Sequence, residues 1–350
     1  MIRNQRSFIL VLLLLLIVTV ILAIAIGAVH ISLSDMMAAC RHIFRNKEIA
    51  SIREHVFLQL RLPRVLLTCI TGAILAVSGV LMQGLFRNPI VEPGLVGTSS
   101  GAAFGASVVF VLAAGWSPSL KEMAGPLLVP IFAFGGALLA TWLVYTLSKS
   151  AKHVSIITLL LTGVAINAVC LSGTGFMSYI ARDPQARSIT FWNLGTFSGA
   201  TWTQVLLTAN VAAIVFLFSL RYAKQLNAML LGEEEAGYLG VDTERLKKII
   251  MIINTAMVAV ATSFVGVISF VGLVVPHMMR SLIGSDSRKL LPASMITGAI
   301  LLTVADLLAR ILIAPAEIPV GIITSLTGAP VFIFLLKRMH VLQQKGGGYA

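Results

Sequence analysis

The run from Val154 to Ala181 contains no aspartate, glutamate, lysine or arginine, and it is one of at least eight such stretches in this 350-residue chain. A single soluble core stops growing at a few hundred residues, so it could not keep this much contiguous apolar sequence away from water. We therefore expect lipid to be the solvent for most of this protein.

The composition agrees with a membrane protein and excludes several other classes. The chain is 57% hydrophobic but only 11% charged, whereas an average soluble domain is about 25% charged. The net charge of +12 comes from basic residues scattered through short loops, a pattern typical of topology signals rather than of nucleic-acid binding. The three cysteines, Cys40, Cys69 and Cys170, lie far apart, and the histidines are dispersed. No disulfide framework and no metal site are predicted.

The uncharged stretches predict an all-α, polytopic membrane protein with about ten transmembrane helices, because a helix needs roughly 20 residues to span the hydrocarbon. They form one permease domain over residues 1–350. The stretches are 8–28, 65–86, 94–120, 123–148, 154–181, 188–220, 249–279, 290–305 and 318–336, and the last helix is expected over about 318–337. The stretch 249–279 is long for one span, so we expect Val274-Val275-Pro276 to break it into a long and a shorter helix.

The distribution of positive charge predicts the orientation. The first stretch is longer than the apolar region of about 7–15 residues in a signal peptide, so we expect a retained helix that starts in the cytoplasm. An even number of spans then places both termini there. Basic residues on the predicted cytoplasmic side agree with this, namely Lys149, Lys152, Arg280, Arg288, Lys289, Lys337, Arg338 and Lys345. The basic loop over 30–64 is an exception, which indicates a task for its charges outside the membrane.

Four local features are candidates for function. The first is Arg61-Leu62-Pro63-Arg64, just ahead of the second span. Pro63 suits the first turn of a helix, and a spacing of three places both guanidinium groups on one face. The pair either anchors the end of the helix or binds carboxylates of a soluble partner.

The second feature is the segment from Phe86 to Gly94, in which two prolines and a glycine prevent a helix from continuing. Such a turn is either a plain connector or a constriction at the mouth of a pore. The polar Asn88 beside the apolar Ile90 could close a pore by packing and dewetting.

The third feature is the charged segment over about 224–241. Leu226, Met229 and Leu230 share one helical face, and three glutamates follow at 233–235. Consecutive carboxylates are costly in lipid, so the segment must lie in the cytoplasm. It is either a solvated loop or a short amphipathic helix, ended by Gly237 and Gly240, that docks on a cytoplasmic partner.

The fourth feature is the pair Asp306 and Arg310 within an otherwise apolar stretch, followed by Glu317. A spacing of four lets the first two side chains pair. They form either a structural ion pair or, together with Glu317, the relay of a proton-coupled transporter. The sequence contains no Gly-x-x-x-x-Gly-Lys-Ser/Thr phosphate loop and no paired nucleophile and base. We therefore expect that the chain is not an enzyme by itself.

Several segments together resemble the permease subunit of bacterial ABC importers for ferric siderophores, haem and vitamin B12. The resemblance runs in order over nearly the whole chain. The segments are Arg61 to Arg64, Gln83 to Pro89, Glu92 to Gly97, Val274 to His277, and Ile318 to Thr324 with Gly328 to Pro330. The resemblance implies the ten-helix fold of the vitamin B12 permease and a homodimer in the bacterial inner membrane. It also implies two cytoplasmic ATPase subunits and a periplasmic or lipid-anchored binding protein.

The resemblance assigns roles to individual residues. Docking of the binding protein falls on Arg61, Arg64 and Arg310. A cytoplasmic gate falls on Asn88, Ile90, Ile156 and Ile157. Coupling to the ATPase falls on Leu230, Gly232, Glu235, Ala236, Gly237, Tyr238, Leu239 and Gly240. No cofactor is expected in this chain, because ATP and Mg²⁺ would be bound by the ATPase.

The cargo is the least constrained part of the prediction. The segment from Phe191 to Trp202 is similar to haem and siderophore permeases, although its aromatic residues could equally be interfacial anchors. Haem ranks slightly ahead of a ferric siderophore, and cobalamin is third. A proton-coupled secondary transporter and a non-transporting membrane receptor are the alternatives from other classes.

Overall fold

Within a bilayer the backbone must satisfy its own hydrogen bonds, which favours helices throughout an apolar chain. The computed structural model describes residues 5–27, 31–44, 51–113, 125–150 and 153–346. The ten apolar helices are α1 (Gln5–Ala25), α4 (Leu62–Leu85), α5 (Thr98–Leu112), α7 (Leu128–Leu147), α8 (Ile156–Ile180), α10 (Trp202–Met229), α12 (Thr243–Val265), α13 (Val271–Ile283), α14 (Ser287–Ile311) and α15 (Val320–Gly346). Of the apolar helices in the described ranges, seven are long enough to span a membrane and three are shorter. The prediction of an all-α, polytopic membrane protein is confirmed.

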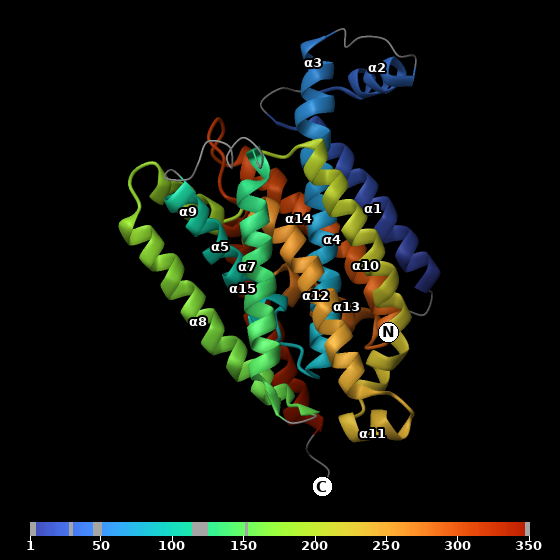
Figure 1. Cartoon of the computed structure of the whole chain (residues 1–350). Coiled ribbons are helices and arrows are strands. Elements are labelled where there is room, and N and C mark those ends of the chain that lie inside the picture. Colours follow the sequence, from blue (N-terminus) through green and yellow to red (C-terminus); the bar gives the residue numbers. More distant parts are fainter. Residues whose placement is uncertain (1–4, 28–30, 45–50, 114–124, 151–152, 347–350) are drawn as a thin grey trace.

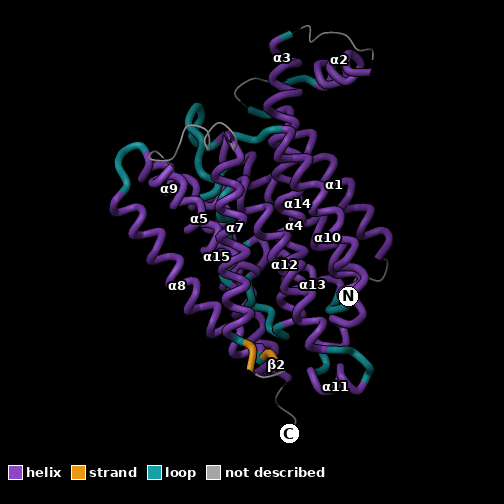
Figure 2. Tube along the Cα trace, viewed as in Figure 1, coloured by secondary structure: helices purple, strands orange, loops and turns teal. Residues whose placement is uncertain are grey.

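Short elements connect these helices, most of them toward the two ends of the bundle (Figures 1 and 2), whereas the turn over 93–96 lies beside the middle of α8. They are α2 (Leu33–Phe44), α3 (Ile52–His55), the π-helical turn η1 (Val56–Arg61), the 3₁₀ turns η2 (Pro93–Val96) and η4 (Gly125–Leu127), α9 (Gln185–Asn193), α11 (Glu233–Tyr238), and the two-residue strands β1 (Lys149–Ser150) and β2 (His153–Val154). The helices α2 and α3 project from one end, and α11 lies at the opposite end together with β2. Helix α15 ends toward the α11 end.

The helices differ in how much of their surface other helices cover. About the centre of the bundle stands α4, which packs against α10, α12, α13 and α14 and has 78% of its most apolar window buried. Helix α8 runs along one edge (Figure 1), and only 17% of its window is buried. An apolar helix that packs so little against its own chain must be covered by lipid or by another protein.

The break that divides the stretch 249–279 lies earlier than predicted. Helix α12 ends at Val265 and α13 begins at Val271, while Pro276 lies inside α13. Proline removes the hydrogen bond to the carbonyl four residues before it, which here is the carbonyl of Gly272. The amide of Gln83 on α4 donates to that carbonyl at 3.5 Å and to the carbonyl of Leu273 at 3.1 Å. A side chain of another helix therefore makes the proline tolerable, which the local sequence could not reveal.

Two other predicted boundaries also differ. Helix α1 starts at Gln5 rather than residue 8, so Arg6 lies in its first turn, where a long side chain can reach the membrane surface. Helix α15 extends to Gly346, beyond the predicted end near residue 337. Residues 28, 30, 45–50, 114–120, 123, 124 and 152 of the predicted stretches and loops lie outside the described residues.

Glycine pairs bring the central helices into close contact. A Cβ atom on Gly72 of α4 would lie 2.2 Å from the carbonyl oxygen of Gly298 on α14, and one on Gly136 of α7 would lie 2.2 Å from that of Gly101 on α5. In lipid, apolar burial does not drive helices together, so such close packing supplies much of their association. The small-residue patch around Gly101 therefore serves helix packing.

Adjacent glycines on α7 allow a matched test of this packing. An alanine at Gly136 meets backbone atoms of α5, whereas the Cβ position of Gly135 has no atom within 4 Å. Gly136→Ala should cost about 1–3 kcal/mol through overpacking. Gly135→Ala should be neutral or slightly stabilising, because alanine is the better helix former. Thermal unfolding in detergent measures both, and equal melting temperatures for the two variants would contradict the packing account.

Candidate functional site

Candidate residues gather at both ends of the bundle. At the α2–α3 end, Arg64 binds two carboxylates that are remote in sequence. Its Nη2 lies 2.9 Å from Oδ1 of Asp306, and its Nη1 lies 2.9 Å from Oε1 of Glu317. The predicted pair is also present, since Nε of Arg310 lies 3.1 Å from Oδ2 of Asp306. The buried carboxylate of Asp306 thus accepts from two guanidinium groups.

The remaining contacts of this cluster go to the end of α1. Arg61 donates to the carbonyls of Ile24 and Ile26. Arg310 donates to the carbonyl of Ala23 at 2.9 Å. These carbonyls belong to the last turn of α1 and to the residue that follows it, where they lack intrahelical donors and where positive charge is favourable. Both arginines are buried, so the structure gives them a capping role that sequence reasoning missed.

Together these side chains form an arginine cluster, which consists of Arg61, Arg64, Arg310, Asp306 and Glu317. The structure brings together all three arginines that the resemblance assigns to docking. It also engages each of them within the chain. Glu317 is the exposed member, with 40% of its side chain accessible, against 11% for Arg64. The edge formed by Arg64 and Glu317 is therefore the part of the cluster that a partner can reach.

At the α11 end, the chain reverses directly after α4. Arg87 adopts a left-handed conformation with a φ of 51°, and the side-chain oxygen of Asn88 accepts the N–H of Ile90 at 3.0 Å. This turn leaves Ile90 exposed. The same end carries the start of α8, where Ser155 caps the helix and Ile157 is 70% exposed while Ile156 is half-buried.

The chain that follows the first candidate gate segment contacts α8 far from the second segment, which is the start of α8 itself. The carbonyl of Leu95 in η2 accepts from the amide of Asn167 at 3.0 Å. Asn167 lies about three helical turns beyond Ile157 on α8. The turn that follows the loop with Asn88 and Ile90 is thus fixed to the middle of α8, whereas Ile156 and Ile157 lie in the first turn of that helix.

The structure divides the predicted coupling segment into two parts. Residues 224–229 complete α10, in which Leu226 and Met229 are fully buried. A turn over 230–232 separates them from α11, so Leu226, Met229 and Leu230 do not form one face of a free amphipathic helix. The reason is that α10 continues two turns past its uncharged stretch, because Leu226 and Met229 find a core to pack against.

Helix α11 itself presents a mixed surface. Ala236 is buried, but Tyr238 and Leu239 are 88% and 64% exposed. Glu233, Glu234 and Glu235 fill its first turn, where negative charge is favourable. Gly240 follows with a φ of 82°, a conformation that favours glycine. Large exposed apolar side chains on a short acidic helix are typical of a surface that another protein covers.

Two hollows lie beside α8 in the described part of the chain. One, of about 550 Å³, has polar side chains in its wall, including Glu92, Ser99, Ser100, Asn167 and Asn193. The carboxylate of Glu92 also accepts the N–H of Phe270 at 3.1 Å. Phe270 has a φ of 69° and ends the break between α12 and α13, so Glu92 fixes that break.

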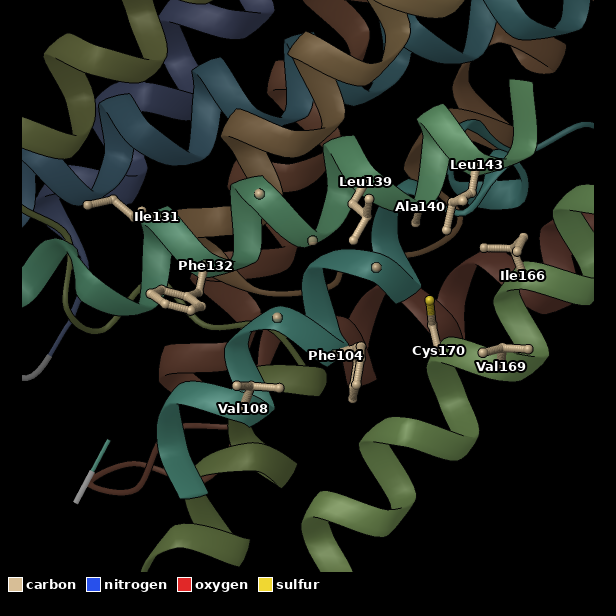
Figure 3. Close-up of a pocket in the computed structure, with 14 residues that line it drawn as sticks. Phe104, Val108, Ile131, Phe132, Leu139, Ala140, Leu143, Ile166, Val169 and Cys170 are labelled. Atoms are coloured by element: carbon tan, nitrogen blue, oxygen red, sulfur yellow. The ribbon is translucent and has the colours of Figure 1, made fainter. Parts of the chain in front are cut away.

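The second hollow is an apolar groove of about 480 Å³ between α5, α7 and α8 (Figure 3). Its labelled side chains are hydrocarbon except for the thiol of Cys170. Among the described residues there is also no group of three His, Cys, Asp or Glu side chains that could hold a metal ion.

Comparison with known proteins shows the family. Residues 15–338 match the model of the FecCD transport family. The hemin transport system permease protein HmuU of Yersinia pestis is 43% identical over 84% of this chain and 86% of its own. The iron(III) dicitrate transport system permease protein FecD of Escherichia coli is 38% identical over 82% of this chain and 86% of its own. An inward-facing structure of a metal-chelate type ABC transporter has a TM-score of 0.81 at 31% identity and covers 95% of this chain and 99% of its own.

These matches extend over nearly the whole bundle, including the arginine cluster, both hollows and α11. The chain therefore belongs to the FecCD transport family, as the non-catalytic, membrane-spanning permease subunit of an ABC importer.

Proposed function

We propose that this permease imports haem across the bacterial inner membrane, driven by ATP hydrolysis in a separate subunit. The assignment of haem as the cargo rests on the 43% identity to a hemin permease over most of both chains. Relatives named for cobalamin at 41% and iron(III) dicitrate at 38% keep vitamin B12 and ferric siderophores as the other cargoes.

The proposed assembly uses both ends of the bundle. Two copies of the chain form a homodimer, and the weakly covered α8 is a face that a second copy could bury. Two ATPase subunits, which bind ATP and Mg²⁺, dock at α11 on the cytoplasmic side. A periplasmic or lipid-anchored binding protein docks at the α2–α3 end. Helix α15 ends on the α11 side (Figure 1), which supports a cytoplasmic C-terminus; the N-terminus is assigned there as well.

The proposed mechanism is alternating access. ATP binding draws the ATPase subunits together, and α11 passes that motion to the helices. The apolar side chains Ile90, Ile156 and Ile157, with Asn88, form the cytoplasmic gate, which closes by excluding water. Ile90 and Ile157 are exposed in the single chain, as a gate between two copies requires.

The contacts of Asp306 argue against a proton-coupled transporter. Its carboxylate accepts from Arg64 and Arg310, and the second acid of the suggested relay, Glu317, is also bound to Arg64. Protonating Asp306 would remove the negative charge that the guanidinium groups of Arg64 and Arg310 share, which is costly where both are largely shielded from water. The cluster is therefore better suited to structure and docking than to proton transfer.

Uptake measurements distinguish these functions. In vesicles that contain the permease, its ATPase and the binding protein, haem accumulation should require ATP and should persist when the pH gradient is collapsed. The same vesicles loaded with cobalamin or a ferric siderophore measure cargo preference. Uptake driven by a pH gradient without ATP would exclude the proposed function.

The Arg64–Glu317 edge gives a test of docking. If Arg64 receives a carboxylate of the binding protein, Glu317 competes for it, so Glu317→Gln should raise the affinity for the binding protein by about threefold. Asp183→Asn removes an exposed charge next to Pro184 and is the control. Surface plasmon resonance on the permease in nanodiscs measures both, and an unchanged affinity for Glu317→Gln would remove Arg64 from the docking site.

Gly237 tests the assignment of α11. A Cβ atom at this position meets no atom of the chain within 4 Å, so Gly237→Trp should leave the permease folded and obstruct only a partner. We expect the ATPase subunit to bind at least about tenfold more weakly, a loss of about 1.4 kcal/mol. Gly199→Trp is the control, because its Cβ position is equally open. Normal ATPase binding by Gly237→Trp would place the partner elsewhere.

A further inference from the structure

Lys247 is a fully buried cation near the start of α12. Its side chain is 1% exposed, although it belongs to a residue type that is almost never buried without partners. An ammonium group has three donors, and here each finds an acceptor. Nζ donates to the carbonyl of Val154 at 2.8 Å, to Oε1 of Glu244 at 2.8 Å, and to Oε1 of Glu233.

The three acceptors come from three different elements. Glu233 is the first residue of α11, and Glu244 lies in the first turn of α12. Val154 is the last residue of β2 and directly precedes Ser155, the N-cap of α8. The second oxygen of Glu244 also accepts the N–H of Val154 at 3.0 Å. Val154 is therefore held through both its backbone groups.

This arrangement joins two of the candidate sites. The first turn of α8 carries Ile156 and Ile157, two and three residues beyond Val154. The coupling surface of α11 starts at Glu233. Hydrogen bonds between ionised groups are short and strong, and one cation shared by three acceptors strongly resists separation of the elements.

We propose that Lys247 is a positioning residue that transmits the movement of α11 to the start of α8 and so links the ATPase to the cytoplasmic gate. The inference rests on the proposed function, and it names the contact inside this chain through which that function operates. When α11 moves, Glu233 moves with it, and the shared ammonium pulls Val154 and the cap of α8 in the same direction.

A second connection supports this direction of transmission. The end of α10, which leads into α11, is held at the start of α14 by Asn227. Its Nδ2 donates to Asp286 at 2.7 Å, and its Oδ1 accepts the N–H of Ser287 at 2.7 Å. The guanidinium of Arg288 beside it holds the pKa of the Asp286 carboxyl well below its usual range. The chain that leads into α11 is thus anchored to the buried helix α14, and the first residue of α11 is joined through Lys247 to the exposed helix α8.

The test compares Lys247→Met with Lys248→Met in the complete transporter with its ATPase and binding protein. Methionine retains the apolar stem and removes the ammonium, and Lys248 is the exposed neighbouring residue. The measured quantity is haem transported per ATP hydrolysed, with co-purification of the ATPase as the readout of assembly. We expect Lys247→Met to lower the ratio by about fivefold or more while the ATPase still co-purifies. Lys248→Met should keep the wild-type ratio.

A wild-type ratio in Lys247→Met, with only a lower melting temperature, would show that Lys247 is merely structural and would overturn the proposal. If Lys247→Met does not assemble, the same ratio measured on Glu233→Gln decides, since that variant removes one charge from a partly exposed side chain. Failure of the proposed function can be told apart from failure of the Lys247 proposal. In that case the wild-type transporter itself would show no ATP-dependent uptake of haem.

Discussion

Polar groups that lie where water is scarce must find partners within the chain, and the rest of this structure depends on that constraint. The carbonyl freed by Pro276 accepts from Gln83 of another helix. The last carbonyls of α1 accept from Arg61 and Arg310. Each contact joins elements that are remote in sequence. Without it a buried polar group would be unpaired, which costs roughly several kcal/mol in a membrane. The polar contacts therefore determine which helices are held together and at which level.

Glycine packing and polar contacts divide the bundle into a tightly packed centre and a more exposed helix, α8. Helices α4, α13 and α14 are joined by glycine contacts and by Gln83, and together with α12 they form the buried centre. Helix α8 packs against α5, η2 and α7, and polar contacts fix it at Asn167 and at its start. A largely exposed helix that is held at defined points can be repositioned without disrupting the core. This suits a transport subunit whose helices must move between two arrangements.

Local patterns in the sequence predicted the helices, but contacts between distant residues could not be inferred from them. The uncharged stretches predicted ten apolar helices, and the spacing of four predicted the pairing of Asp306 with Arg310. The bond from Arg64 to Asp306 joins residues 242 positions apart, and that from Lys247 to Val154 joins residues 93 apart. The prediction of a helix break at Pro276 was wrong for the same reason, since the compensating Gln83 lies on another helix. Only the spacing of Glu244 and Lys247 gave a local sign of the buried cation.

We propose that ATP-driven movement enters this subunit at α11 and reaches the start of α8. The most direct measurement is the spin–spin distance between labels on Ile157 in the two permease copies of the assembled transporter, with and without bound ATP. Ile157 is 70% exposed in the single chain, so a label there should leave the packing within each permease copy unchanged. The account predicts that ATP binding shifts this distance and that the shift is lost when the ammonium of Lys247 is removed. A distance that does not respond to ATP would contradict it.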